Sequence, residues 1–148
     1  MKRDPNLVPL SHQHHNGLAL CVLTDRALAG DDSPDRAGQL GERIANRYDV
    51  ELASHFEIEE QLLFPACPPE LDGLVAQLLA EHRQIEDIVD AIKESPSARL
   101  LRDFIALMRR HIRAEEGELF EKLQATLPRA TLDDLGRKIE ARVVRVCL

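Results

Sequence analysis

The chain has 148 residues, of which 44% are hydrophobic and 30% are charged, so it is long enough for one globular domain with a sizeable core. The formal net charge is −7, and lysine and arginine do not gather in one stretch. This balance argues against a nucleic acid or an anionic membrane as the partner. Aromatic residues make up only 3% of the chain and tryptophan is absent, which argues against a large aromatic binding surface.

Targeting and disulfide patterns are absent from the sequence. The first residues contain no apolar run typical of a signal peptide, and no run of about 18 apolar residues predicts a membrane span. Cys21, Cys67 and Cys147 are scattered and form no CxxC pair, which supports neither a disulfide framework nor a zinc ribbon. We therefore expect a reduced, cytoplasmic protein whose cysteines are inert small hydrophobic residues.

The first two helices are predicted from apolar periodicity and from turn residues. Apolar residues recur at helical spacing almost everywhere, and no alternating pattern predicts a strand. The first helix is predicted over residues 10–29 and is ended by Gly30 and the two aspartates after it. The second begins at Ser33-Pro34, where serine is the N-cap and proline takes the first helical position, and it ends near Phe64.

Prolines also mark the limits of the next two helices. The two prolines at 68 and 69 form a connection, and the third helix is predicted over about residues 70–93. Ser95-Pro96 repeats the cap-and-proline start, and the fourth helix runs from there to about Ala125. Four long helices with short connections predict an all-α, up-down-up-down four-helix bundle over about residues 10–125.

An additional C-terminal helix is predicted over about residues 131–147. Pro128 stops the fourth helix, and Thr131 with the acidic residues after it resembles an N-cap and first turn. The apolar stripe of this fifth helix would either cap the bundle or pair with a second subunit, which leaves a homodimer open. No internal boundary is visible, so residues 1–148 are treated as a single domain. The stripe consists of Leu132, Leu135, Ile139, Val143 and Val146.

An internal repeat carries the functional argument. Two segments share the pattern HxxxEExxLF, one from His55 to Phe64 and the other from His111 to Phe120. Each copy follows a helix that contains a shorter motif, a histidine with an aliphatic residue three positions later. The chain therefore reads as two similar helical hairpins.

Each hairpin offers one histidine on its first helix and a histidine–glutamate pair on its second. The single histidines are His15 and His82, and the glutamates of the pairs are Glu59 and Glu115. Residues four apart on a helix lie one turn apart on the same side, so each pair can bind one metal or two neighbouring metals.

The spacing of the four histidines predicts that they meet at one level of the bundle. In an antiparallel hairpin, residues equidistant from the turn lie at the same height. The midpoint of His15 and His55 is residue 35, that of His55 and His82 lies between 68 and 69, and that of His82 and His111 lies between 96 and 97. All three midpoints fall on turns assigned from glycine and proline alone.

A pair of metal ions would satisfy this inward-facing set. Six buried polar groups would each cost several kcal/mol if they were unpaired. Imidazole and carboxylate ligands suit iron, manganese or zinc, and two metals bridged by carboxylates favour iron. The predicted metal ligands are His15, His55, Glu59, His82, His111 and Glu115.

These residues resemble the hemerythrin family, in its bacterial HHE cation-binding branch, over roughly residues 10–125. The resemblance implies a four-helix bundle with a di-iron site, in which two carboxylates and an oxo or hydroxo oxygen bridge the irons. It implies that His15 and His55 hold one iron and that His82 and His111 hold the other. The two glutamates of the repeated motif would be the bridges.

The sequence departs from the oxygen-carrying hemerythrins at two places. Those proteins have a further histidine one turn before the position of His82, where this chain has Leu78. They also use a carboxylate five residues after the last histidine, which here would be Glu116 rather than Glu115. The missing histidine favours a more open iron, to which water, Glu86 or an exogenous ligand would bind, over reversible oxygen carriage.

Other histidines and glutamates near the motifs are alternatives to this set. His14 is the main rival of His15, which is preferred because its motif copies the one at His82. His12 is expected to be solvated or to lie just outside the ligands, and its place three residues before His15 leaves it near the site.

Further acidic residues flank the repeated motif, and a tyrosine lies two turns before its first histidine. Glu60 and Glu116 are expected to face water or to lie just outside the ligands, and Glu51 is expected at the surface. Tyr48 is expected to be an ordinary core residue.

Three functions are compatible with these residues. The first is a non-haem di-iron protein that binds or senses dioxygen, nitric oxide or peroxide at an open iron position, and it is preferred over a dedicated enzyme. The alternative is a di-iron oxidoreductase or stress-repair enzyme that reduces peroxide or nitric oxide, or delivers iron, with a redox partner that the sequence does not identify. In the third, zinc or another redox-silent metal stabilises the bundle.

Overall fold

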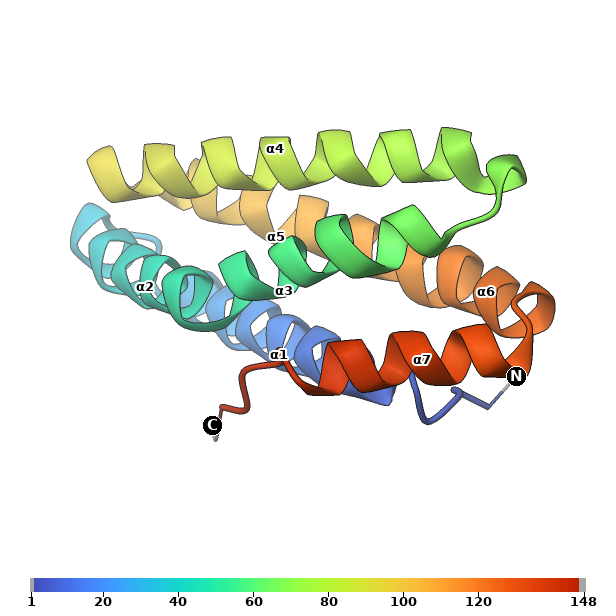
Figure 1. Cartoon of the computed structure of the whole chain (residues 1–148). Helices are drawn as coiled ribbons and strands as arrows, with labels where there is room; N and C mark the ends of the chain where they lie inside the picture. The colour runs from blue at the N-terminus through green and yellow to red at the C-terminus, as the bar shows by residue number, and fades with distance from the viewer. Residues whose placement is uncertain (1, 147–148) are drawn as a thin grey trace.

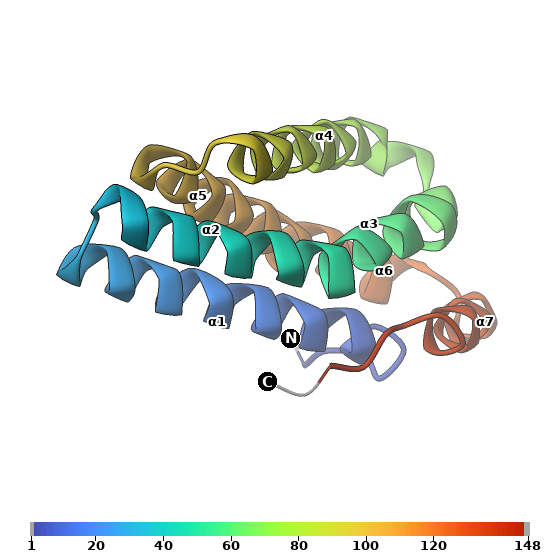
Figure 2. The same cartoon turned by 90° about the vertical axis from the view of Figure 1, so that its left-hand side faces the viewer.

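The computed structural model describes residues 2–146, which are helical or irregular and contain no β-strand. The expectation of an all-helical chain is therefore confirmed. Four long helical segments lie side by side, and a shorter helix lies across one end (Figures 1 and 2). The α-helices are α1 Val8–Gly30, α2 Pro34–Arg47, α3 Ala53–Ile58, α4 Asp72–Glu94, α5 Ala98–Ala114, α6 Phe120–Thr126 and α7 Arg129–Glu140.

Wider π-helical turns make two of the long segments continuous. Tyr48–Leu52 joins α2 to α3, Glu59–Leu63 extends α3, and Glu115–Leu119 joins α5 to α6. Two short 3₁₀ turns, Phe64–Ala66 and Pro69–Leu71, lead into α4. The long segments pack mainly through α5, which contacts both α1 and α4, and through α2 against α4.

The apolar core consists of two clusters with a polar layer between them. One cluster joins α1, α2, α4 and α5, and the other joins the opposite ends of these segments to α7. Along the fourth segment, Met108 belongs to the first cluster and Leu119 to the second, while the buried His111 and Glu115 lie between them. The polar layer is thus enclosed by apolar side chains on both sides.

The start of α5 differs from the prediction at Ser95-Pro96. Ser97 is the N-cap, and its side chain accepts a hydrogen bond from the Leu100 backbone N–H at 3.2 Å. Ser95 instead ends α4, where its N–H donates to Ala91 O at 2.9 Å. The serine at the start of α2 does cap as predicted, since Ser33 accepts from the Arg36 N–H.

The fifth helix is shorter than predicted and begins earlier. It starts at Arg129 with Pro128 in the cap position, so Thr131 lies inside the helix rather than at its cap. It ends at Glu140, and the chain then leaves the helix and runs back towards α1, where the Val144 carbonyl accepts from Gln13 Nε2 at 3.0 Å. Cys147, the last predicted position, lies outside the described residues.

The apolar face of α7 is used within the chain. Leu132, Leu135 and Ile139 are buried in the second cluster, together with residues of α1 and of the long segments. The N-terminal residues also close on this helix, because the Asn6 side chain donates to Asp133 at 2.8 Å. Of the two expectations for the fifth helix, the structure therefore places it as a cap on its own bundle, and pairing with another subunit stays a prediction.

The described cysteines are free and have raised pKa values. Cys21 is buried and Cys67 is partly buried. Burial raises the pKa of Cys21 to about 11 and that of Cys67 to about 12, so both thiols stay protonated at neutral pH. Within residues 2–146, no helix combines the length and the apolar character needed to cross a lipid bilayer.

Candidate metal centre

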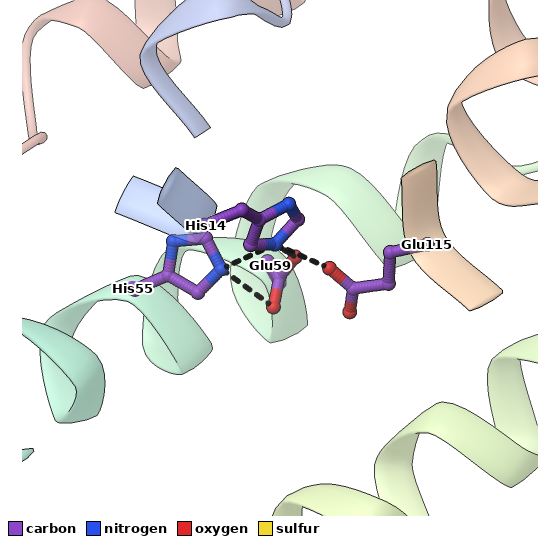
Figure 3. A group of neighbouring side chains, drawn as sticks. All are labelled: His14, His55, Glu59 and Glu115. Carbon is purple, nitrogen blue, oxygen red and sulfur yellow. Dashed lines mark hydrogen bonds and ion pairs between the residues drawn. The ribbon is translucent and has the colours of Figure 1, made fainter. Parts of the chain in front are cut away.

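Six buried side chains from four different segments meet in the polar layer. They form two groups that share both glutamates, and in each group the potential ligand atoms all lie within 4.8 Å of one another. Figure 3 shows the first group, in which two imidazoles and two carboxylates point towards one another. The first group is His14, His55, Glu59 and Glu115, and the second is Glu59, His82, His111 and Glu115.

Five of the six predicted residues are in these groups, and His15 is not. The His15 side chain is exposed, whereas His14 is 4% exposed and faces the other ligands. The structure corrects the prediction here because the buried face of α1 has a strict helical register that includes position 14 and excludes position 15. That face also contains Leu10, Gly17 and Cys21.

The Glu115 carboxylate spans the two groups. Its Oε2 lies 2.9 Å from His14 Nε2, and its Oε1 lies 2.8 Å from His111 Nε2. One carboxylate oxygen therefore faces each group, which is the arrangement that a carboxylate needs to bridge two cations. The fourth segment supplies this residue one helical turn after His111.

The Glu59 carboxylate also reaches both groups, through a single oxygen. Its Oε1 lies 3.3 Å from His55 Nε2 and 3.1 Å from His82 Nε2. Its Oε2 is fully buried and has no hydrogen-bond partner among the described residues. An oxygen left in this state is costly unless a cation or water binds it.

Each of the four histidines has a hydrogen-bonded oxygen at Nδ1. Such an oxygen favours the tautomer with the proton on Nδ1, which turns the Nε2 lone pair towards the centre. Glu60 and Glu116, expected in water or just outside the ligands, are two of these partners. The Nδ1-to-oxygen pairs are His14–Glu116 at 2.6 Å, His55–Gln13 at 2.7 Å, His82–Glu60 at 2.8 Å and His111–Glu81 at 2.9 Å.

The inner atoms of the cluster fit metal cations better than they fit one another. His14 Nε2 and His55 Nε2 lie 3.1 Å apart, and with both protons on Nδ1 neither nitrogen has a hydrogen to donate. His111 Nε2 and both oxygens of Glu115 are buried without a hydrogen-bond partner among the described residues, in spite of their short separations. Four imidazole nitrogens and two carboxylates in this state suit two divalent ions such as iron, manganese or zinc.

The pKa values of the cluster follow from burial and mutual contact. Burial and the neighbouring His14 hold the pKa of His55 well below its usual range, so its imidazole is neutral and able to bind metal. Burial and Glu115 raise the pKa of Glu59 well above its usual range. Burial opposes the charge on His111, but Glu115 and Glu81 raise its pKa to about 9.

Both shared glutamates begin a π-helical turn, at equivalent positions of the repeat. The turns are Glu59–Leu63 and Glu115–Leu119. A π-turn is wider than an α-turn and inserts an extra residue, and such turns are frequent at functional sites. The insertion lets two consecutive glutamates reach the cluster. Glu60 contacts Nδ1 of His82, while Glu59 contacts Nε2 of the same histidine.

Three residues considered in the sequence lie elsewhere than expected or outside the cluster. Glu86 pairs with Arg83 at 2.8 Å and belongs to neither group of potential ligands. Glu51 is buried rather than at the surface, and its carboxylate accepts from Asn16 Nδ2 at 2.9 Å. His12 is exposed, as expected.

Gln13 and Glu81 were missed as partners of the histidines. Each directly precedes the single histidine of its hairpin, and each contacts the histidine on the second helix of that hairpin. This correspondence is visible in the sequence only when His14 is aligned with His82. The preference for His15 concealed it.

The family model for the hemerythrin HHE cation binding domain matches residues 7–123 of the chain. The chain belongs to the hemerythrin family. The resemblance stated from the motifs is therefore confirmed, and the two groups of side chains lie within the matched residues. Neither the curated proteins nor the solved structures gave a match to the chain. Helix α7 lies beyond the matched residues.

Proposed function

We propose that this hemerythrin-family chain holds two iron ions and binds or senses dioxygen, nitric oxide or peroxide at an open position on one of them. The observation that carries the proposal is the pair of buried groups of imidazoles and carboxylates that share Glu59 and Glu115. Imidazole with carboxylate is a ligand set for iron, and manganese and zinc are possible substitutes. Bound iron would supply the electrons and the ligand-binding position.

The side chains of the chain would hold the metals and exclude water from them. In this proposal His14 and His55 hold one ion, and His82 and His111 hold the other. Phe56 stacks on His82 with ring centroids 4.0 Å apart, and Phe120 stacks on His14 at 5.5 Å. These rings and the two apolar clusters would limit solvent access to the centre.

The open position is supported by what surrounds the second group. Leu78, one turn before His82, is a fully buried apolar residue that offers no ligand atom. Glu86 is turned to Arg83 instead. Each group offers four ligand residues, so an ion that takes more than four ligands would have room for a small exogenous one.

The remaining parts of the proposal concern the whole protein. The colour ramp of Figure 1 runs in opposite directions along consecutive long segments, which supports the up-down-up-down order of the bundle. A cytoplasmic location rests on the scattered cysteines of the sequence. A homodimer and a separate redox partner remain expectations.

Metal content, the visible spectrum and oxygen mixing test the proposal together. We expect about two irons per chain and, in the oxidised protein, charge-transfer bands of an oxo-bridged di-ferric centre. Stopped-flow mixing of the di-ferrous protein with oxygen or nitric oxide should give a spectroscopically distinct adduct. Prompt, irreversible oxidation with no adduct would remove the binding function, and zinc at full occupancy would favour a purely structural metal.

A di-iron oxidoreductase is the second candidate, and the apolar Leu78 favours it because an open iron can also react. Such an enzyme would reduce peroxide or nitric oxide with electrons from a partner protein, or deliver iron. Steady-state turnover with peroxide or nitric oxide and a reductant distinguishes the two. Turnover above that of free iron is expected for the enzyme and not for the binding protein.

A further inference from the structure

The four histidines differ in the chemistry of their Nδ1 partners. Three partners are carboxylates, and the fourth, on His55, is the neutral amide of Gln13. The His82–His111 position therefore has two carboxylate partners, whereas the His14–His55 position has one. The three carboxylate partners are Glu60, Glu81 and Glu116.

The orientation of the Gln13 amide is fixed from both ends. Its Oε1 lies 2.7 Å from His55 Nδ1, and its Nε2 donates to the carbonyl oxygen of Val144 at 3.0 Å. Because a carbonyl can only accept, the amide nitrogen must face Val144 and the amide oxygen must face His55. Gln13 is only 3% exposed, so this geometry is held by packing as well.

A carboxylate and an amide affect a metal-bound imidazole differently. A carboxylate that accepts the Nδ1–H makes the imidazole a stronger donor and offsets part of the charge of the metal, while an amide oxygen carries no charge to do so. All three carboxylates also contact an arginine, so the presence of an arginine beside the carboxylate does not by itself distinguish the two positions. The contacts are Glu116–Arg3 at 3.2 Å, Glu81–Arg110 at 3.4 Å and the close pair Glu60–Arg83.

Polar cavities lie against Nδ1 partners of both positions, because one has Gln13 in its wall and another, of about 210 Å³, has Glu60 in its wall. The cavity against Gln13 has a volume of about 90 Å³, and its wall includes Asn16, the buried Glu51 and the C-terminal residues 143–146. Gln13 lines this cavity and also contacts His55. Access to a cavity therefore does not distinguish the two positions, and the difference rests on the Nδ1 partners.

We propose that Gln13 makes the His14–His55 position the weaker of the two metal positions, so that its metal is the first to exchange. Gln13 acts as a positioning residue, because it contacts His55 rather than the metal. The proposal rests on the proposed function, since it requires two bound metals. It means that the two positions differ in metal affinity even though their direct ligands are of the same types.

Cobalt titration of the metal-free, full-length chain tests the inequality. Co²⁺ is the probe because its d–d absorption reports how many nitrogen and oxygen ligands it has, and a competing chelator sets the free concentration. We expect two steps whose affinities differ by about tenfold or more, since changing an outer partner of a metal ligand alters affinity by about 10- to 100-fold.

Exchanging amide and carboxylate at Gln13 and Glu60 shows which step of the Co²⁺ titration belongs to which metal position. Gln13→Glu should tighten the weaker step about tenfold, and Gln13→Ala should loosen that step alone. Glu60→Gln should loosen the tighter step by about 10- to 100-fold and leave the weaker one unchanged. Gln39→Glu, the same exchange at an exposed position of α2, is the matched control and should change neither step.

The outcomes separate this inference from the function on which it rests. Circular dichroism of each metal-free variant checks that the helices are intact. If Gln13→Glu fails to fold, Gln13→Ala and Glu60→Gln still test the inference. Two equal steps in the unmodified chain, or Gln13 variants that shift the tighter step, would overturn the inference while two-metal binding stands. Absence of Co²⁺ binding would overturn the proposed function and the inference with it.

Discussion

His14 and His15 are neighbours in the chain, yet only the His14 side chain faces the interior of the bundle. One residue corresponds to a rotation of about 100° around a helix, which separates a buried position from an exposed one. The Nε2 atom of His14 lies 2.9 Å from Glu115, within reach of a shared metal. At the scale of single residues, this rotation decides which of the two histidines joins the buried cluster.

The first prediction compares these two histidines. His14→Ala removes an imidazole from the cluster and should lower the bound metal from about two ions per chain to one or fewer. His15→Ala removes an exposed side chain and should leave the metal content unchanged. Elemental analysis of both purified variants measures the difference. Equal losses of metal would contradict the assignment of His14, rather than His15, as a metal ligand.

A second prediction concerns the buried carboxyl of Glu59 in the metal-free chain. Its raised pKa means that the folded chain binds this proton more tightly than the unfolded chain does. The contribution of Glu59 to the free energy of unfolding therefore falls as the pH rises from about 4.5 towards the raised pKa. Glu59→Gln removes the titrating group and should stabilise the metal-free chain at pH 7 by roughly 1–3 kcal/mol.

Urea unfolding of the metal-free protein between pH 5 and pH 8 measures this effect. The variant should show a shallower loss of stability with rising pH than the unmodified chain, although it binds metal less well. An unchanged slope would contradict the assignment of the titration to Glu59. Such a gain in stability with a loss of binding is the expected trade-off where a site is built from repelling groups.

Helix boundaries are decided at the scale of the element by backbone geometry. Ser97 has an extended backbone with φ −144° and ψ 156°, which aims its hydroxyl at the free N–H groups of the first turn of α5. Ser95 lies two residues earlier and ends the preceding helix. Both serines fit a cap motif in the sequence, but only one has the conformation of a cap.

The third prediction follows from this difference. Ser97→Ala removes the accepting hydroxyl and should lower the free energy of unfolding by about 1 kcal/mol. Ser95→Ala should change it by less than about 0.5 kcal/mol. Thermal and urea unfolding of the two variants measure this, and a larger loss for Ser95 would mean that the cap is misassigned.

At the scale of the whole molecule, α7 closes one end of the bundle and completes its second apolar cluster. Leu132 and Ile139 are fully buried there, next to Leu63 and Phe120. The matched hemerythrin domain ends at residue 123, so these contacts come from outside it. The helix is thus part of the core that encloses the polar layer.

The fourth prediction tests this role of α7. Leu132→Ala removes a fully buried side chain and should lower the free energy of unfolding by about 2–5 kcal/mol. Thr131→Ala, at the exposed neighbouring position, is the control and should have little effect. An equally small effect at both positions would mean that α7 is not docked in solution.

Metal binding should also stabilise the whole molecule, because the folded state alone brings the ligands together. A free metal concentration of about 100 times the dissociation constant should add about 2.7 kcal/mol per site. The midpoint of thermal unfolding should therefore rise with added iron or cobalt and fall with a chelator. No shift would show that the cluster does not bind these metals in the folded chain.

The amino-acid sequence by itself determined the helices, the two hairpins and most of the cluster, because these depend on local spacing. The HxxxE pairs place His55 with Glu59 and His111 with Glu115 on one side of a helix, whichever helices they then face. The hemerythrin resemblance depended on the same pairs. These features could be predicted because side chains four residues apart are neighbours in any α-helix.

Only the tertiary structure decided the features that depend on which other helix lies opposite. The short motif at His15 matched His82, but the packing of α1 turned His14 inward, in register with Leu10 and Gly17. The role of Gln13 likewise could not be predicted from the sequence, because it depends on contacts with His55 and with Val144 near the C-terminus. The physical reason is that a hydrogen bond between segments is set by their relative rotation, which packing of the whole core fixes and local spacing does not.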